Sequence, residues 1–271
     1  MSSAAENNAR LALYQELDEI VGAMKNLAQV ELVRLEKALG RQQSMFQDSV
    51  AALQTLARHY ALPPVADNGQ SLLLALGSER GFCGGFNEQI SRAVTTLEPV
   101  NQQPSLVVGS RLLAKWPPDA EANNLPAPTT IDELLPGMQS ILDTLRETRL
   151  PAQIQVLSHT KAGVSCRQLW PFPEPPDPER STPTKPSASL ALNLDPAELS
   201  GLLRWQCLQQ GLMYYLLQSL SVENHMRLQQ MEGARDHLEE LTQELRLRIN
   251  AQRQQQIVEE IEVILAEQRF D

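Results

Sequence analysis

The feature that most constrains the fold is a pair of long segments without proline, one at each end of the chain. Residues 4–60 contain no proline and are followed by Pro63 and Pro64, and residues 197–270 contain none either. Because proline interrupts a helix, each segment can form one continuous helix. Apolar residues recur in both at intervals of three and four, the spacing of a helix that packs against a partner helix. We therefore predict two long amphipathic helices that pair antiparallel with each other.

The apolar residues predict which face of each helix makes the pair. In the first helix these residues are Leu13, Leu17, Ile20, Met24 and Leu27. In the last helix they are Leu238, Leu241, Leu245 and Ile249, followed by Ile257, Ile261 and Ile264. Residues 248–256 are mostly polar, and polar residues along a coiled-coil seam cost stability. Two interpretations stay open for this stretch: a solvated part of the helix, or a surface shaped for a third partner.

The central segment has the pattern of strands alternating with helices. Three short apolar runs are typical of buried strands: residues 71–77, 105–108 and 153–158. Two helical patterns lie among them: residues 87–97 and 130–149. Such alternation favours a small α/β domain with a mainly parallel sheet. The expected fold class is therefore α/β plus coiled coil, in which a Rossmann-like α/β domain is inserted between two long antiparallel helices.

The domain boundaries follow from these patterns. We expect an N-terminal coiled-coil helix at 1–62, the α/β domain at 68–194 and a C-terminal coiled-coil helix at 197–271. Residues 170–186 are dense in proline and are predicted to form an irregular surface excursion within the α/β domain. Residues 189–194 alternate like a last strand that leads back into the final helix.

Composition excludes several classes of function. The 271 residues include 33 acidic and 23 basic ones, a net charge of -10, which disfavours nucleic acid because phosphate binding requires a basic surface. The three cysteines, Cys83, Cys166 and Cys207, are far apart and form no CxxC pair, and the four histidines are scattered. We therefore predict no metal, no cofactor and no catalytic residue. No signal peptide or membrane-spanning apolar run is expected from the sequence.

The most distinctive local motif is SERGFCGGFN at residues 78–87. It follows a predicted strand and precedes a predicted helix, where a phosphate-binding loop would lie. Its spacing is neither GxGxxG nor GxxxxGK[ST], and it has no lysine that could reach a phosphate. We expect Gly81, Gly84 and Gly85 to form a tight structural turn. A nucleotide-binding enzyme that uses this turn stays open as the less favoured alternative.

Stretches at the start, in the middle and near the end of the chain resemble the gamma subunit of F-type ATP synthases, the central rotor stalk. Residues 20–28 (IVGAMKNLA) are similar to the family pattern I-T-x-A-M-x-M-V-A, and residues 78–87 are close to S-D-R-G-L-C-G-G-L/F-N. Near the end, Ser221, Glu223 and Arg227 follow the spacing of A-S-E-x-x-A-R-M-x-A-M. Residues 250–264 resemble N-x-A-R-Q-x-x-I-T-x-E-I-x-E-I. The order and spacing of these parts fit a gamma subunit along nearly the whole chain.

This resemblance implies a mechanical function. The paired helices would sit inside a ring of alternating alpha and beta subunits, and the α/β domain would contact the epsilon subunit and the membrane ring of c subunits. Rotation would couple ion translocation to ATP synthesis or hydrolysis, with catalysis in the beta subunits. The rotor would meet the surrounding ring at Ala23, Met24, Arg253 and Gln254. The complex would lie at the cytoplasmic face of the bacterial inner membrane, with this chain as a peripheral subunit.

The sequence also departs from the family pattern. Glu19 stands where the family usually has lysine, Val21 replaces threonine and Asn26 replaces methionine. With Glu16 and Asp18, Glu19 makes this part of the first helix unusually acidic. These differences suggest a divergent gamma subunit from a second, alternative F-type ATPase. The remaining alternative is a gamma-derived structural adaptor without rotary coupling.

Overall fold

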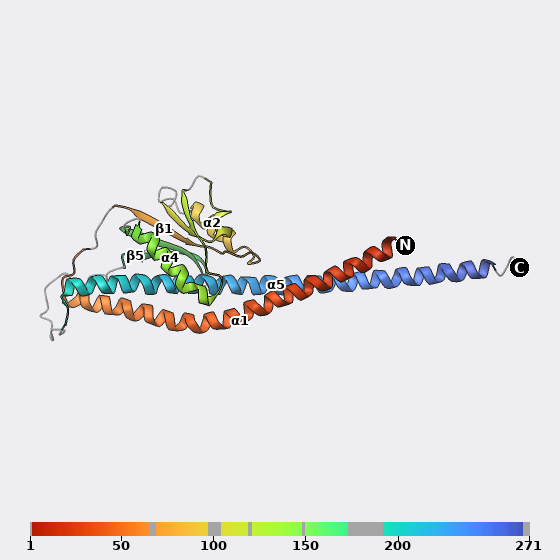
Figure 1. Cartoon of the computed structure of the whole chain (residues 1–271), viewed down its shortest axis with the longest axis horizontal. Helices are drawn as coiled ribbons and strands as arrows, with labels where there is room; N and C mark the ends of the chain where they lie inside the picture. Colours follow the sequence, from red (N-terminus) through yellow and green to blue (C-terminus); the bar gives the residue numbers. More distant parts are fainter. Residues whose placement is uncertain are drawn as a thin grey trace. The chain divides into compact units, whose positions relative to one another are not determined.

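In the part of the chain that the structure describes, two long helices and several shorter ones accompany a five-stranded sheet. The computed structural model describes residues 2–64, 69–96, 104–118, 121–147, 150–172 and 192–267 (Figure 1). Its contacts form two compact units. The helical unit consists of Met1–Gln29 and Arg227–Asp271, and the α/β unit consists of Val30–Met226. The expected domain division at 1–62, 68–194 and 197–271 stays a prediction, since each long helix contributes to both units.

Both predicted long helices are confirmed. Helix α1 spans Ser2–His59 and helix α5 spans Pro196–Glu267. In the helical unit, the Asn7 side chain donates a hydrogen bond to Gln252 Oε1 at 2.9 Å, and Lys25 Nζ lies 3.1 Å from Glu232 Oε1. Residue numbers rise along α1 while those of their partners fall along α5. The two helices therefore run antiparallel, as the sequence predicts.

The face of α1 that makes the pair in the helical unit differs from the predicted one. Leu13, Leu17, Ile20 and Leu27 are 50%, 38%, 56% and 61% exposed. The face turned to α5 carries another set with steps of three and four, which includes small and polar residues: Asn7, Leu11, Tyr14, Asp18, Val21, Lys25 and Ala28. The prediction was wrong here because this helix has two stripes with helical periodicity. Pairing uses the more polar stripe, where side chains from both helices form ion pairs and hydrogen bonds.

The predicted face of α5 is only partly correct. Met231 and Leu245 are buried, while Leu238, Leu241 and Ile249 are half-buried against α1. The expectation that Ile257 and Ile261 continue the seam was wrong, because they are 47% and 50% exposed. Gln252 already lies opposite Asn7, near the start of α1, so α5 runs past the end of its partner helix. The side chain of Ile264 lies outside the described residues.

The sheet of the α/β unit is mainly parallel. Its strands are β1 (Ser71–Leu76), β2 (Ser105–Val108), β3 (Ala122–Leu125), β4 (Gln153–Thr160) and β5 (Gly163–Trp170). Their order is β3-β2-β1-β4-β5, and only β5 is antiparallel to its neighbour. The three predicted strands are confirmed as β1, β2 and β4. No sequence pattern predicted β3, whose central residues Asn123 and Asn124 are polar and exposed, or β5.

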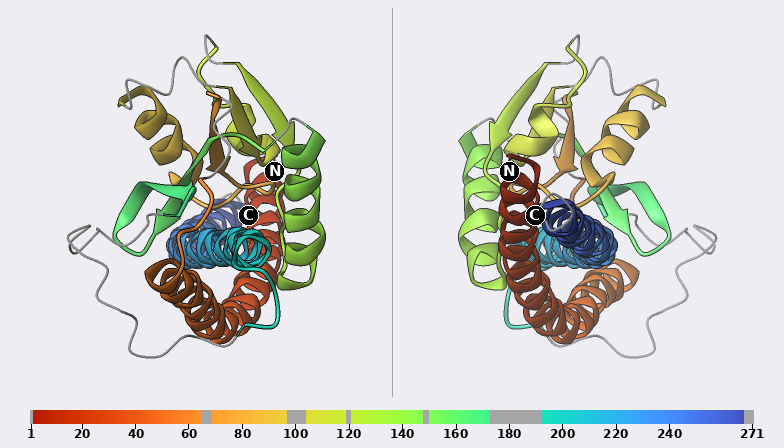
Figure 2. Two further views of the ribbon diagram at one scale, coloured as in Figure 1. Left: turned by 90° about the vertical axis from the view of Figure 1, so that its left-hand side faces the viewer. Right: turned by 90° about the vertical axis from the view of Figure 1, so that its right-hand side faces the viewer.

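Helices cover both faces of this sheet (Figure 2). The predicted helices appear as α2 (Phe86–Thr96) and as the short helix η2 (Ile131–Glu133) continued by α4 (Leu134–Glu147). Alternate residues of a strand point to opposite faces. Leu74 and Leu76 of β1 pack with α4 and with parts of α1 and α5, whereas Leu73 and Ala75 pack with α2 and the short helix α3 (Ser110–Leu113). The two long helices thus form part of the core of the α/β unit.

The predicted proline-dense excursion and the strand after it are mostly beyond the described residues. Trp170, at the start of the excursion, is the last residue of β5. Residues 173–191 lie outside the described residues, and so does the first half of the strand expected at 189–194. Residues 192–194 form no strand and lead directly into α5. The expected strand was therefore wrong in its described half. Among the described residues, no helix is both long and apolar enough to cross a bilayer.

A buried histidine makes the stability of the α/β unit sensitive to pH. The ring of His159 stacks on Phe86 with 4.1 Å between centroids, and Nε2 lies 2.8 Å from the Phe86 carbonyl oxygen. Burial lowers the pKa of His159, although this hydrogen bond acts in the opposite direction. As pH falls below about 6.5, the histidine of the unfolded chain binds a proton that the folded chain still excludes.

We therefore expect the free energy of unfolding to fall as pH is lowered from about 7 to 5. Denaturant titrations followed by the fluorescence of buried Trp116, in the same core cluster as Phe86, will measure it. Acidic groups also titrate in this range. The relevant quantity is therefore the difference between the wild type and His159→Phe in how the free energy of unfolding depends on pH. An identical pH dependence in both chains would contradict this role of His159.

Candidate functional site

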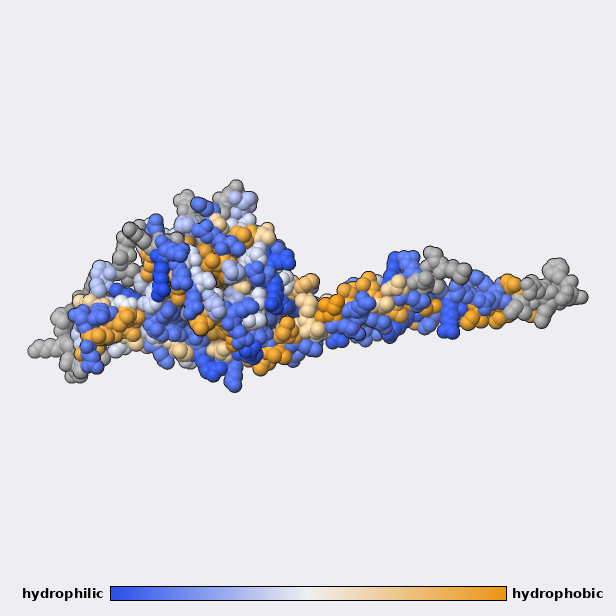
Figure 3. Space-filling view, in the orientation of Figure 1, coloured by the Kyte–Doolittle hydropathy of each residue, from blue (hydrophilic) through white to orange (hydrophobic). Residues whose placement is uncertain are grey.

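Helix α1 presents an apolar surface that the described residues of the helical unit leave exposed. Leu13, Leu17, Ile20 and Leu27, here called the α1 stripe, lie three, four or seven positions apart on one face of the helix, and each is at least 38% exposed. Figure 3 shows apolar surface along the paired helices of this unit. A continuous row of large exposed apolar side chains is typical of a surface that another protein covers.

The structure places the four predicted ring-contact residues in two separate patches of the helical unit. Ala23 is exposed and Met24 is half-buried, and both lie between Ile20 and Leu27 of the α1 stripe. Arg253 and Gln254 are exposed on α5, next to Gln252, which pairs with Asn7. Met24 is therefore about 25 Å along the helix pair from the level of Arg253, at 1.5 Å per residue. The structure does not bring the two pairs together, and their contact with a surrounding ring stays a prediction.

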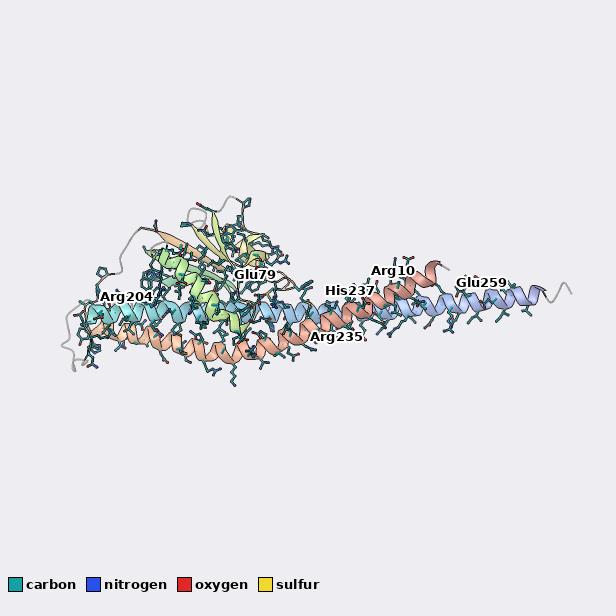
Figure 4. The ribbon with its side chains drawn as sticks, in the orientation of Figure 1. Arg10, Glu79, Arg204, Arg235, His237 and Glu259 are labelled. Atoms are coloured by element: carbon teal, nitrogen blue, oxygen red, sulfur yellow. The ribbon has the colours of Figure 1, made fainter. Side chains whose placement is uncertain are left out.

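An ion pair fixes the register of the two helices between these patches. Arg235 of α5 (Figure 4) donates from Nε to Asp18 Oδ1 at 2.9 Å and from Nη2 to Oδ2 at 3.4 Å. The hydrogen bond to Asp18 raises the pKa of Arg235. Exposed pairs of this kind contribute little to stability, so their effect here is mainly geometric. The neighbouring acids Glu16 and Glu19 are exposed and add negative charge to this part of α1.

The turn at residues 78–87 is held by a small network of side chains. The backbone N–H of Ser78 donates to Asn87 Oδ1 at 3.0 Å, and Asn87 Nδ2 donates to Ser78 Oγ at 2.8 Å. Cys83 Sγ lies 3.5 Å from Ser78 Oγ, and all three side chains are buried. Asn87 therefore joins the start of α2 back to the end of β1. The serine, cysteine and asparagine of this motif therefore have a structural role.

The three glycines of the turn differ in how much they need to be glycine. Gly84 has a backbone φ of 57°, a conformation that residues with a side chain rarely adopt. A Cβ atom at Gly81 would meet nothing within 4 Å, and one at Gly85 would make ordinary contact with the Gln89 side chain at 3.6 Å. Phe82 also has a positive φ, 60°, and its side chain is 65% exposed. The turn thus displays an aromatic residue to solvent.

Side chains fill the place where this type of sheet most often binds ligands. In the strand order β3-β2-β1-β4-β5, the chain switches direction between β1 and β4, and ligands bind at the carboxyl ends of those strands. Here Phe86, at the start of α2, stacks on His159 near the end of β4. Cys83 packs in the same core cluster as Phe86. This arrangement favours a structural role for the turn over nucleotide binding.

Glu79, labelled in Figure 4, lies in the loop after β1 and bonds to the loops after β2 and β3. Its carboxylate accepts hydrogen bonds from the backbone N–H of Ser110 at 3.1 Å, from Ser110 Oγ at 2.6 Å and from the backbone N–H of Ala127 at 3.1 Å. Burial acts to raise the pKa of Glu79, but these hydrogen bonds outweigh that effect and lower it. Glu79 is thus an anchor for the carboxyl edge of the sheet.

A second structural carboxylate, Glu31 of α1, was not among the predicted residues. It is only 7% exposed, and it accepts a hydrogen bond from the backbone N–H of Ile131. Its position contained a signal that could have identified it. Ala28, Glu31 and Leu35 lie three and four residues apart, and all three are buried. An acidic residue in such a row indicates a buried carboxylate with a specific partner.

Comparison with known proteins supplies an independent line of evidence. A family model described as ATP synthase matches residues 3–267. Proteins named ATP synthase gamma chain from Clostridium kluyveri and Clostridium novyi are each 25% identical to this chain. Each alignment covers 73% of this chain, and the covered shares of the two relatives are 72% and 73%.

Solved structures show the same fold. One is a Euglena gracilis mitochondrial ATP synthase described as OSCP/F1/c-ring in rotational state 3, with a TM-score of 0.63 at 13% identity; the match covers 98% of this chain and 93% of that one. Another is the central stalk and c-ring of the Tetrahymena thermophila mitochondrial ATP synthase, with a TM-score of 0.53 at 18% identity, covering 79% and 99%. At these identities the likeness concerns the fold alone.

Proposed function

The chain belongs to the ATP synthase gamma family, and from that premise we propose that it rotates inside a ring of alpha and beta subunits. It contacts this ring at two patches, Ala23 with Met24 and Arg253 with Gln254. It is a non-catalytic subunit, the central stalk that couples ion translocation to ATP synthesis or hydrolysis by rotation. Its partners are the alpha and beta subunits that surround the stalk and the membrane ring of c subunits. We include the epsilon subunit in this proposal.

The main observation that supports this proposal is the exposure of the α1 stripe. The two helices of the helical unit pair through side chains such as Lys25 and Glu232, and they leave a row of leucine and isoleucine exposed. A pair of helices that served only to hold itself together would bury its largest apolar side chains first. The exposed stripe, with Ala23 and Met24 beside it, therefore fits a shaft enclosed by other subunits.

Rotation of such a shaft can drive catalysis at a distance. The α1 stripe occupies one face of the helical unit, while the acidic residues Glu16 and Glu19 add charge nearby. Each surrounding subunit meets a different part of this surface as the shaft turns. A contact that is stronger in one conformation of a subunit shifts its population toward that conformation. The shaft needs no catalytic group of its own for this role.

The location of the complex follows in two steps. The chain is part of an ATP synthase complex associated with a membrane. We place it at the cytoplasmic face of a bacterial inner membrane, because the curated relatives at 25% identity come from two bacteria. The acidic Glu16 and Glu19 support a further proposal, that the chain serves a second, alternative ATPase with its own ring. Purification that yields only the standard alpha and beta subunits would contradict this part.

Changing Arg253 and Gln254 together tests the proposed contact on α5. We expect Arg253→Ala with Gln254→Ala to lower the ATP-driven turnover of the assembled complex by about tenfold or more. Hydrogen bonds that involve a charged group contribute about 1.5–3 kcal/mol, equal to about 10- to 150-fold in an equilibrium constant. Steady-state ATP hydrolysis and ion pumping by the purified complex will measure the change.

A matched pair of residues on the same helix provides the control. Arg248 pairs with Glu244 at 2.6 Å and Gln255 with Glu259 at 3.1 Å, each within α5. Replacing both with alanine removes the same two residue types, yet it should change turnover by less than about twofold, as surface substitutions usually do. Unchanged assembly and turnover in the Arg253 and Gln254 variant would show that these residues do not contact the ring.

A further inference from the structure

Glu31 is a buried carboxylate of α1 that reaches the start of η2 within the α/β unit. Its Oε1 accepts a hydrogen bond from the backbone N–H of Ile131, 100 residues away in the sequence. The first N–H groups of a helix have no partner inside that helix, and an acidic group there also interacts favourably with the helix dipole. At the start of η2 and α4, that acidic group is supplied by the long helix α1.

Arg34 completes the connection between the two elements. Its Nη1 donates to Glu31 Oε2 at 3.3 Å, and its Nη2 donates to the Asp132 carboxylate at 3.2 and 3.3 Å. The Arg34 and Asp132 side chains are 49% and 76% exposed, so their ion pair alone adds little stability. Its effect is to hold the guanidinium beside Glu31, whose carboxylate would be costly to leave unpaired in the interior.

The same segment is anchored to the sheet from the other end. Glu79, which follows β1, accepts a hydrogen bond from the backbone N–H of Ala127 at 3.1 Å. Between Ala127 and η2, the N–H and hydroxyl groups of Thr129 donate to Glu133 at 2.7 and 2.8 Å. Residues 127–133 are therefore fixed to the sheet by Glu79 and to α1 by Glu31. Helix α4 continues from this segment and packs in the core beside the long helices (Figures 1 and 2).

We propose that Glu31 is a positioning residue which, with Arg34 and Asp132, holds α1 to the start of η2 and α4 against twisting. Apolar packing between helices has no preferred direction, whereas hydrogen bonds to a fixed backbone group resist rotation and sliding. Glu31 lies two residues after Gln29, at the point in the sequence where α1 passes from the helical unit into the α/β unit. The inference rests on the central-stalk function: torque passes between α1 and the segment of η2 and α4 through this contact within the α/β unit.

The test uses the complete complex in lipid vesicles and compares two readouts. For Glu31→Ala we expect ATP hydrolysis to stay near the wild-type rate, while the number of ions pumped per ATP falls by about two- to thirtyfold, the range of measured coupling effects. Hydrogen exchange at the Ile131 amide should become about five- to hundredfold faster, since its acceptor is removed. Glu31→Gln keeps an acceptor oxygen for Ile131, so it should restore most of the pumping.

An exposed pair of similar geometry serves as the control. Asp143 of α4 pairs with Arg146, three positions away, at 3.6 Å, and both side chains are largely exposed. Like Glu31→Ala, Asp143→Ala removes a carboxylate that pairs with an arginine three residues further along the helix. It should leave the rate of ATP hydrolysis and the number of ions pumped per ATP unchanged. If Glu31→Ala lowers only the melting temperature and the pumping ratio stays at the wild-type value, Glu31 is merely structural and the proposal is wrong.

A second variant covers the case in which Glu31→Ala does not assemble. Arg34→Ala with Asp132→Ala changes only side chains that are at least 49% exposed, and it should reduce the pumping ratio in the same direction. If the number of ions pumped per ATP is unaltered in this variant, the proposed role of Glu31, Arg34 and Asp132 is wrong. If the wild-type chain itself fails to join alpha and beta subunits, the central-stalk function fails instead, so the two failures are distinguishable.

Discussion

Replacing Leu17 and Ile20 with glutamate should weaken binding of the chain to its alpha and beta subunits by about 30- to 1,000-fold, equal to about 2–4 kcal/mol. The side chains are 38% and 56% exposed, so a surrounding ring would cover about half of each, which is worth about 1 kcal/mol per residue. Burying two glutamate side chains without partners adds a further cost. Titration of labelled chain into an alpha–beta mixture will measure the affinity.

The control for this variant uses positions on another face of the same helix. Ala12 and Gln15 are exposed and lie outside the α1 stripe, so Ala12→Glu with Gln15→Glu adds the same residues where no large apolar side chain is lost. This variant should bind at least about tenfold more tightly than the Leu17 and Ile20 variant, a difference of about 1.4 kcal/mol. Circular dichroism should show the same helix content in both isolated chains. Equal affinities in the two variants would mean that the α1 stripe is not the contact surface.

Gly109→Ala should destabilise the α/β unit by about 2–6 kcal/mol, the sum of backbone strain and overpacking. Gly109 has a φ of 111°, which side chains rarely adopt, and its N–H donates to the Leu125 carbonyl oxygen at 2.8 Å. A Cβ atom there would lie 2.6 Å from the Ser78 carbonyl oxygen. Because that neighbour is backbone at the end of β1, it cannot move without disturbing the turn at residues 78–87. Urea denaturation followed by tryptophan fluorescence will measure the loss.

Gly81→Ala is the matched control for Gly109→Ala. A Cβ atom at Gly81 would meet nothing within 4 Å, so alanine there should change the free energy of unfolding by less than about 0.5 kcal/mol. The comparison separates the glycine that the backbone requires from one that the family motif merely contains. If Gly81→Ala lowers the free energy of unfolding as much as Gly109→Ala does, this explanation of the strain at Gly109 is wrong.

The sequence predicts most of the regular structure because its signals are local. The proline-free ends define α1 and α5, and the apolar runs define β1, β2 and β4 within a few residues. Strand β3 has no such run, since its two central residues are exposed asparagines at the edge of the sheet. Strand β5 pairs antiparallel with β4, and half of its residues are only partly buried. Its identity as a strand depends on that pairing, which no short sequence window contains.

The contact face of α1 could not be predicted, because choosing between two stripes requires knowledge of the partner helix. Leu13, Leu17 and Ile20 form the more apolar stripe, and packing against α5 alone would favour burying it. The structure instead turns Asp18 and Lys25 toward α5, where Arg235 and Glu232 meet them. This choice fits the proposed shaft, which other subunits enclose. Glu31 was missed for a related reason, since its partner Ile131 is distant in the sequence.

The most direct test of the central-stalk function is to observe whether the chain turns. The complex of this chain with its alpha and beta subunits is fixed to a surface through the ring, and a visible probe is attached to the α/β unit. During ATP hydrolysis, we predict rotation of the probe in one direction, in discrete steps that stop when ATP is removed. A complex that hydrolyses ATP at the normal rate while a firmly attached probe stays still would contradict the rotary function.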